Sequence, residues 1–207
     1  MRKGNLFIIS GPSGIGKDTV LQILLKEEKN LKLSISSITR PMRTGEVEGE
    51  KYHFISRETF EQMLQGDAFL EHNVYCGNYY GTPKQPVFDW LEAGFDVILE
   101  IDVNGAMKIM ESYPECVSVF MLPPSLQVLK HRLLKRGTED EQTVKARLTQ
   151  AGKEIQMASR YDYVMVNDVL EDAVADLRAI IRANTLLKKN NLDLIDEVKK
   201  DAESFDW

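Results

Sequence analysis

Glycines and one lysine near the N-terminus have the spacing of a phosphate-binding loop. Residues 11–17 are GPSGIGK and match the pattern G-x-x-x-x-G-K. In such a loop the backbone N–H groups and the start of the following helix face the anion, while the lysine places a positive charge on the β- and γ-phosphates. The pattern favours a nucleoside triphosphate site over a glycine-rich turn without a ligand. The predicted loop consists of Gly11, Pro12, Ser13, Gly14, Ile15, Gly16 and Lys17.

The next position departs from the usual pattern. A Ser or Thr that coordinates Mg²⁺ commonly follows the lysine, but here Asp18 does, with Thr19 after it. A carboxylate beside a bound phosphate is repelled, so we expect Asp18 to point away from the nucleotide and to favour the helix N-terminus. Mg²⁺ would then be held mainly by phosphate oxygens, water and other side chains.

Two arginines form a second candidate phosphate site. Arg40 and Arg43 lie three residues apart in a loop that also contains Pro41 and Gly45. Arginine offers paired, planar donors, and a dianionic monophosphate can engage two guanidinium groups. Taken alone, the two side chains are also consistent with a solvated loop.

Two carboxylates follow or interrupt an apolar run at residues 97–101. Glu100 and Asp102 lie where a parallel strand would end, which is where α/β proteins bind ligands. Alternation along a strand would aim both side chains to the same face. The alternative for Glu100 is structural, with one of the two carboxylates capping the loop at Asn104 and Gly105.

The elements that must position these residues alternate in type. Apolar runs predict buried strands at residues 5–10, 97–101, 117–121 and 163–166. Helical periodicity appears at 17–28, 126–135, 141–158 and 170–186. Strands that alternate with helices predict a parallel α/β sheet with helices on both faces.

Three segments depart from this alternation of strands and helices. Residues 34–86 are rich in Ser, Thr, Gly and Tyr and are expected to form an insert, and the basic segment 126–158 is expected to be a helical flap. Residues 190–207 form a polar, acidic tail of unassigned role. We therefore expect one domain over 1–207, with its core in 1–33, 87–125 and 159–189.

Composition excludes several classes of protein. The 207 residues are 43% hydrophobic and 28% charged, which is ordinary for a globular protein and unlike disordered or collagen-like chains. The net charge of −6 disfavours general nucleic-acid or anionic-membrane binding. Two cysteines, with no long apolar run, predict a cytoplasmic protein. The three histidines have no metal-ligand spacing.

Taken in order, these motifs resemble the guanylate kinase family of nucleoside monophosphate kinases. The resemblance runs to about Lys189 and includes residues 10–17, 36–46, 52–54, 69–71, 77–82, 98–105, 132–138 and 166–168. It implies a P-loop NTPase-type parallel sheet, a GMP-binding lobe at 34–86 and a lid over ATP at 126–158.

The resemblance also implies a role for each matching residue. The clamp on the GMP phosphate would be Arg40, Arg43, Tyr52 and Tyr80, and guanine would be read by Ser36, Glu71, Thr82 and Asp102. On the ATP side it implies Arg132, Arg136 and Arg147, with Arg136 against adenine and Asn167 bordering that pocket. Glu100 would hold Mg²⁺ through water. The implied catalytic set is Lys17, Arg40, Arg43, Arg132 and Arg147, whereas Lys130 and Lys135 are expected to be solvated.

The activity implied is Mg²⁺-dependent transfer of the γ-phosphoryl group of ATP to GMP, with dGMP as a further expected acceptor. Guanine presents N–H donors that one carboxylate can accept together, and adenine lacks that donor pair. Two alternatives remain: a ribose bisphosphate kinase on the same scaffold, and a non-catalytic guanylate kinase-like binding module. The first would not need Ser36, Glu71 and Asp102, and the second would be expected to lose the phosphate loop. No oligomeric state is implied.

Overall fold

A five-stranded parallel sheet forms the centre of the computed structural model, which describes residues 2–75, 77–135 and 141–205. Its order is β2-β7-β1-β8-β9. The strands are β1 (Leu6–Ser10), β2 (Leu31–Leu33), β7 (Asp96–Glu100), β8 (Val117–Leu122) and β9 (Tyr163–Val166). Because all pairs are parallel, with Ile9 opposite Glu100, the carboxyl ends of β1 and β7 share one edge.

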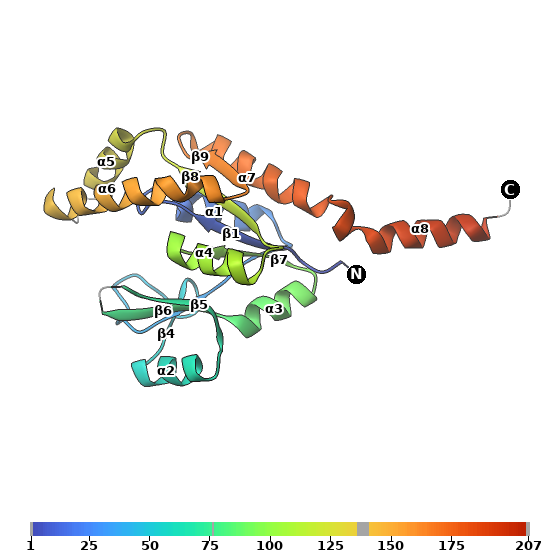
Figure 1. Ribbon diagram of the computed structural model, residues 1–207, viewed down its shortest axis with the longest axis horizontal. Helices are drawn as coiled ribbons and strands as arrows, with labels where there is room; N and C mark the ends of the chain where they lie inside the picture. Colours follow the sequence, from blue (N-terminus) through green and yellow to red (C-terminus); the bar gives the residue numbers. More distant parts are fainter. Residues whose placement is uncertain (1, 76, 136–140, 206–207) are drawn as a thin grey trace.

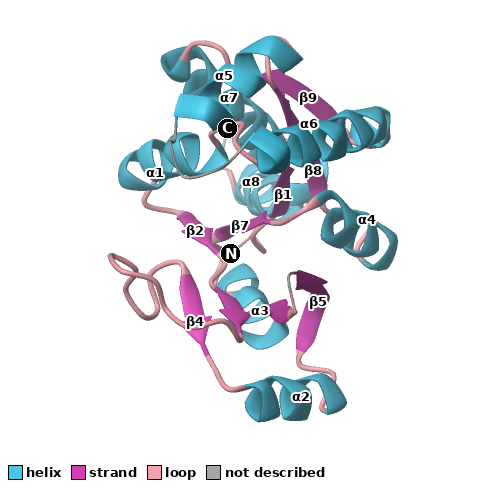
Figure 2. Cartoon of the chain, turned by 90° about the vertical axis from the view of Figure 1, so that its left-hand side faces the viewer, coloured by secondary structure: helices cyan, strands magenta, loops and turns pink. Residues whose placement is uncertain are grey.

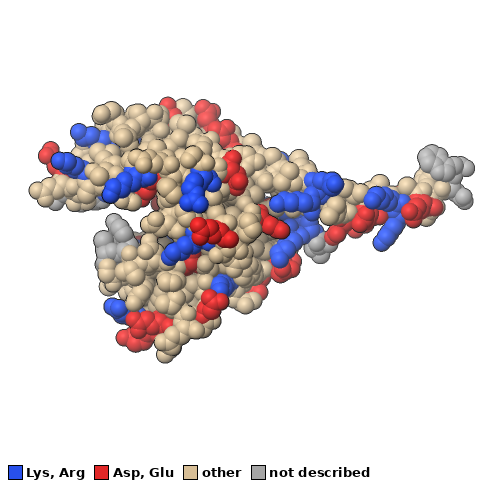
Figure 3. Space-filling view, viewed as in Figure 1, with Lys and Arg blue, Asp and Glu red and all other residues tan. Residues whose placement is uncertain are grey.

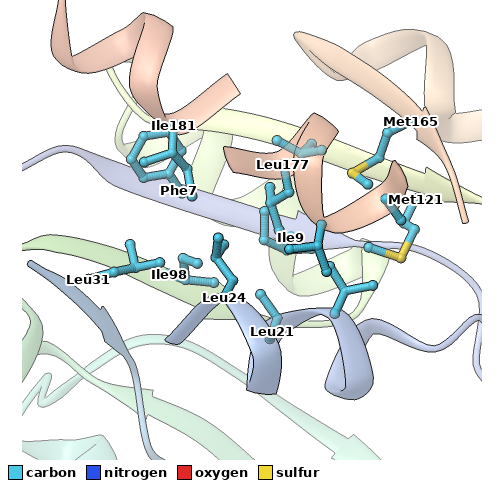
Figure 4. Packing of buried hydrophobic residues seen from close by; sticks show 14 of the residues in the cluster. Phe7, Ile9, Leu21, Leu24, Leu31, Ile98, Met121, Met165, Leu177 and Ile181 are labelled. Carbon is cyan, nitrogen blue, oxygen red and sulfur yellow. The ribbon is translucent and has the colours of Figure 1, made fainter. Parts of the chain in front are cut away.

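Apolar side chains cover both faces of this sheet. On one face, β1 and β8 pack against helices α1 (Lys17–Glu27) and α7 (Leu170–Thr185), as the labelled cluster in Figure 4 shows. The other face packs against α3 (Lys84–Glu92), α4 (Val103–Ser112) and the short 3-10 turn η1 (Gln156–Arg160). Every residue of β1 is buried, which explains why its sequence is continuously apolar instead of alternating.

A smaller sheet forms the insert, here called the acceptor lobe (residues 34–86). It has the order β4-β3-β6-β5 and lies below the central sheet in Figure 1. Its strands are β3 (Ser36–Ile38), β4 (Tyr52–Phe54), β5 (Phe69–Tyr75) and β6 (Asn78–Pro83), with helix α2 (Arg57–Gln65) packed beside them. Phe60 stacks on Phe69 and Tyr79, and Gly81 leaves room for both phenylalanines, since a Cβ there would lie within 3 Å of each ring.

Two helices, α5 (Leu126–Lys135) and α6 (Glu141–Ile155), pack on each other through Leu129, Leu133 and Val144 and are here called the lid. In the space-filling view the molecular outline is notched between the lid above and the acceptor lobe below (Figure 3). The view turned by 90° likewise separates α5 and α6 from the lobe elements β4 and α2 (Figure 2). The lid therefore faces the lobe across an opening.

The chain ends in a projecting helix. After the turn η2 (Lys188–Asn190), α8 (Leu192–Ser204) leaves the body of the molecule and buries none of its residues (Figure 1). The tail, whose sequence predicts no particular element, is thus helical. None of the described helices combines the length and apolarity needed to cross a bilayer.

The predicted parallel α/β sheet, flanked by helices on both faces, is confirmed. The four strands expected from apolar runs all occur, and the helix expected at 141–158 ends as α6 at Ile155 with η1 after it. The sequence did not predict the strands β2, β3 and β6 or the helices α2, α3 and α4. Helix α3 begins at Lys84, inside the segment assigned to the acceptor lobe, because Val87 and Leu91 pack onto the central sheet.

Candidate active site

The loop after β1 has the backbone geometry that a phosphate site requires. Gly11, Gly14 and Gly16 have φ angles of 149°, 88° and 100°, which L side chains rarely adopt. A Cβ on Gly16 would lie 2.7 Å from Asn167 Nδ2. The Ile15 carbonyl accepts a 2.8 Å hydrogen bond from that amide, so the residue that follows β9 holds the loop in place. The glycines thus serve both turn geometry and close packing.

Lys17 begins α1 and lies among opposite charges. Its ammonium donates a 2.9 Å hydrogen bond to the Gly11 carbonyl. Burial lowers its pKa, and the Glu100 carboxylate only partly offsets that effect. Burial and the negative charge of Asp18 in turn raise the pKa of Glu100, at the end of β7. A desolvated ammonium group beside a glycine loop is strongly stabilised when an anion binds there.

Asp18 is turned toward the acceptor lobe. Its carboxylate forms a hydrogen-bonded ion pair with Lys51, which lies just before β4. Burial opposes the charge of Asp18, but the hydrogen bond and the positive charge of Lys51 hold its pKa below the ordinary value. The structure thus gives Asp18 a specific partner, Lys51, which the sequence did not suggest.

The lid reaches the phosphate loop through two arginines. Arg147 on α6 donates a 2.5 Å hydrogen bond to the hydroxyl of Ser13. Arg132 on α5 instead donates to the main-chain carbonyls of Ile15 at 3.2 Å, Asn167 at 2.8 Å and Asp168 at 3.4 Å. Arg132 therefore ties α5 to the loop and to the end of β9, beside the groove whose lining includes Gly14, Gly16 and Thr19.

The other lid predictions have different outcomes. Arg136 lies outside the described residues. Lys130 and Lys135 are exposed, as expected for a solvated helix face. Asn167 is buried, with 5% of its surface exposed, and its side chain holds the phosphate loop in place.

The predicted acceptor-phosphate clamp is gathered on the acceptor lobe, but one of its arginines is already paired. Both terminal nitrogens of Arg40 contact the carboxylate of Glu46, at 2.7 and 2.5 Å. Its guanidinium lies 5.5 Å from the ring centre of Tyr52 and interacts with Tyr80. The Arg43 side chain is exposed, and its backbone N–H donates to Glu46 at 2.7 Å. Glu46 therefore orders the loop that carries both arginines.

A cluster of polar side chains lies where β5 and β6 approach the start of α4. Glu71 and Thr82 are directly opposite in the strand register, and the Thr82 hydroxyl donates a 2.8 Å hydrogen bond to Glu71 Oε1. Glu71 is 8% exposed, and burial raises the pKa of its carboxyl to about 7. The lack of a side chain at Gly105 makes room for this group, since a Cβ there would lie 2.8 Å from Glu71 Oε2.

Asp102 joins this cluster from the central domain. It is the N-cap of α4 and accepts 2.7 Å and 2.9 Å hydrogen bonds from the Gly105 backbone and the Asn73 amide. Strand β7 ends at Glu100, so strand alternation does not extend to Asp102. The loop-capping role that we considered for Glu100 thus belongs to Asp102. Ser36 begins β3 opposite Tyr52 and stays a predicted guanine contact.

Three site residues were missed by the sequence reasoning. Asn73 lies two residues after Glu71 on the same strand, so alternation could have identified it. Glu46 follows Arg43 by three residues in a tight turn, which is also a local signal. Lys51 lies 33 residues from Asp18, and nothing in the sequence connects the two.

Glu100 and Asp18 are carboxylates beside Lys17 that could serve a metal ion. Within the described ranges, no three His, Cys, Asp or Glu side chains cluster as metal ligands. Mg²⁺ is commonly held by one or two carboxylates together with substrate phosphates and water, not by an all-protein cage. The residues present fit that kind of site, with Glu100 the better candidate because Asp18 is engaged by Lys51.

Comparison with known proteins finds relatives over nearly the whole chain. The sequence profile of the guanylate kinase family matches residues 3–184. A guanylate kinase of Carboxydothermus hydrogenoformans is 50% identical over 189 residues, covering 91% of this chain and 93% of its own. One from Caldanaerobacter subterraneus subsp. tengcongensis is 46% identical, covering 97% and 98%. The crystal structure of guanylate kinase from Anaplasma phagocytophilum superposes with a TM-score of 0.77 at 33% identity, covering 94% of each chain.

Proposed function

The chain belongs to the guanylate kinase family, and from this membership and the geometry of its site we propose that it transfers the γ-phosphoryl group of ATP to GMP. The products are ADP and GDP. The enzyme is a nucleoside monophosphate kinase with two nucleotide sites, the phosphate loop for ATP and the acceptor lobe for GMP.

One observation carries the choice of acceptor: the buried pair of Glu71 and Thr82 facing the N-cap Asp102. The Thr82 hydroxyl donates a hydrogen bond to Glu71 Oε1. A guanine base offers N1–H and N2–H₂ donors to a carboxylate, whereas adenine lacks this donor pair and would leave Glu71 Oε2 without a donor from the base. A buried acceptor left unpaired is costly, so the pocket discriminates by hydrogen bonding. A ribose bisphosphate has no base to fill this pocket.

The phosphates would meet between the phosphate loop and the acceptor lobe. Lys17 and Arg147 approach from the ATP side, and Arg40, Arg43, Tyr52 and Tyr80 from the GMP side. The acceptor phosphate is itself an anionic nucleophile, so no side chain has to remove a proton from it. The task of the protein is then to align the two phosphates and to balance the charge on the transferred group.

Mg²⁺ fits the same assignment. Glu100 would hold it through water, and Asp18 is too engaged with Lys51 to replace the usual Ser or Thr. When bound, the ion neutralises phosphate charge and orients the phosphate oxygens. The protein residues bind and orient the nucleotides around it.

Closure of the lid and acceptor lobe over bound nucleotides would exclude water and prevent hydrolysis of ATP. Lid contacts to Ser13 and Ile15 support such a role, since they join α5 and α6 to the loop that would carry the phosphates. We place the reaction in the cytoplasm, with ATP and GMP as its small-molecule partners.

A coupled assay of ADP release tests the proposal. Purified protein with Mg²⁺ and ATP is given GMP, dGMP, AMP, UMP, CMP or a ribose bisphosphate in turn. We expect turnover with GMP that far exceeds turnover with AMP and the pyrimidine nucleotides. Faster turnover with the ribose bisphosphate would support the alternative kinase, and no turnover with any acceptor would support a binding module.

A further inference from the structure

An ion pair connects the acceptor lobe to the helix that follows the phosphate loop. Lys51 lies immediately before β4 on the lobe, and Asp18 is the second residue of α1 in the central domain. Their side chains form a hydrogen-bonded pair that is about half exposed, 45% for Lys51 and 49% for Asp18. Because the partners belong to different parts of the fold, the pair can form only when the lobe lies against the core.

Other contacts join the lobe to the core on the side of β5 and α4, whereas β4 and α1 lie on the other side (Figure 2). The Asn73 amide donates to Asp102 at 2.9 Å, and the Lys108 ammonium donates to the His72 carbonyl at 2.9 Å. Both join β5 to α4, beside the predicted guanine pocket. The Asp18–Lys51 pair lies instead at the phosphate end, next to Lys17. The lobe is thus attached to the core at two separated points.

Lys51 also adjoins the predicted phosphate clamp. The next residue along the chain is Tyr52, whose ring lies under the Arg40 guanidinium and 5.8 Å from the Lys51 ammonium. Fixing position 51 against α1 therefore limits where Tyr52 and Arg40 can lie. The charge of Lys51 is balanced by Asp18 and by the nearby Glu100, which act on it from α1 and from the end of β7.

We propose that Lys51 is a positioning residue of the transfer reaction, which acts through Asp18 to favour the arrangement in which the acceptor lobe lies against the phosphate-loop helix. The inference rests on the proposed function. When GMP alone must bring the lobe against the core, part of its binding free energy is spent on that movement and its apparent affinity falls. The ion pair supplies part of that free energy, so GMP binds more tightly. Asp18 thereby has a purpose at a position where a P-loop usually has a hydroxyl.

The first test measures GMP affinity by calorimetry at low salt, without ATP. For a half-exposed ion pair we expect Lys51→Met to weaken GMP binding about two- to fivefold, and Lys51→Arg to restore most of it. In steady-state assays the loss should appear in the KM for GMP and not in kcat. At 1 M NaCl the difference from wild type should disappear, because salt screens exposed charges.

A second background separates action through Asp18 from direct contact with GMP. In Asp18→Asn protein, the further change Lys51→Met should have no additional effect on GMP affinity. The matched control is Lys3→Met, which removes a lysine from an exposed ion pair with Glu92. Lys3 precedes the first residue of β1, whereas the phosphate loop follows the last one. It should leave GMP affinity unchanged.

The proposal is overturned if Lys51→Met does not weaken GMP binding, if it weakens binding equally in Asp18→Asn protein, or if Lys3→Met weakens it as much. A wild-type protein that neither binds nor phosphorylates GMP would overturn the proposed function instead. The ion pair then remains testable by a double-mutant cycle on the unfolding free energy of the nucleotide-free protein. Non-additive effects of Asp18→Asn and Lys51→Met would support the link, and additive effects would refute it.

Discussion

Thr82 and Glu71 face each other across the antiparallel pair β5–β6, and the threonine hydroxyl donates a 2.8 Å hydrogen bond to Glu71 Oε1. The hydroxyl fixes the orientation of a carboxylate that is almost fully buried. An oriented, desolvated carboxylate binds a matching pair of N–H donors strongly and is left unsatisfied by a base without them. In our assignment, the choice of acceptor base therefore depends on this pair of residues.

Replacing Glu71 by Gln should collapse the discrimination between GMP and AMP. The amide retains the size of the side chain but places a donor where guanine also presents donors, so we expect a loss of about 1.5–3 kcal/mol in discrimination. The measurement is kcat/KM for each acceptor, with ATP affinity measured alone as the control. An unchanged GMP/AMP ratio would show that Glu71 does not read the base.

The same carboxyl should make stability depend on pH. Burial raises the pKa of Glu71 from 4.5 to about 7, and Thr82, Asp102 and Lys108 modify that shift. Between these values the folded protein keeps a proton that the unfolded chain releases. The stabilising contribution is therefore complete below pH 4.5 and is lost as the pH rises through 7, on the order of 3 kcal/mol. Urea unfolding across this range should show a smaller decline for Glu71→Gln than for wild type.

Lys17→Ala should remove most turnover while the protein stays folded. The side chain makes one hydrogen bond to Gly11, so its loss costs the fold about 1 kcal/mol. In turnover we expect a loss on the order of 100-fold or more, as for removal of one preorganised electrostatic donor. Rate assays accompanied by thermal melts decide this. Near-normal turnover in a folded variant would refute the phosphate-loop assignment.

Arg43→Ala should weaken GMP binding far more than ATP binding. Its side chain is exposed on the acceptor lobe, whereas Lys17 and Arg147 serve the other nucleotide in our assignment. Loss of a charge-assisted contact costs about 1.5–3 kcal/mol, or about 10- to 150-fold in affinity. Separate titrations with each nucleotide measure it, with Arg57→Ala as a control at another exposed lobe arginine. Equal weakening of both nucleotides would move Arg43 to the ATP side.

Arg132→Met should reduce stability as well as ATP binding. The guanidinium donates to main-chain carbonyls of the phosphate loop and of the segment after β9, so its removal releases α5 from both. We expect about 1.5–3 kcal/mol of lost stability, since the donors are charged. Lys130→Met, on the exposed face of the same helix, should change little. If Arg132→Met alters ATP binding but not the unfolding free energy, the contacts to carbonyls contribute nothing to the fold.

The sequence alone was sufficient for features that depend on local pattern. The phosphate loop is a contiguous run whose glycines and lysine must lie in that order. The apolar run at 5–10 predicts a strand buried on both faces, and the apolar period of 170–186 determines which face of α7 is buried. The parallel arrangement followed because strands and helices alternate along the chain. Glu71 and Asp102 could be named as a pair only through the family resemblance.

Only the tertiary structure decided how distant residues meet. Lys51 pairs with Asp18, Arg132 binds carbonyls of segments far from it in sequence, and Asp102 caps α4 and approaches Glu71 from another sheet. Each of these contacts depends on how the lobe and the lid pack against the core. Side-chain type and spacing indicate which groups could bind a phosphate, a base or a carbonyl. The partner that each side chain contacts depends on which surfaces are buried against each other, and packing across the whole chain determines those surfaces.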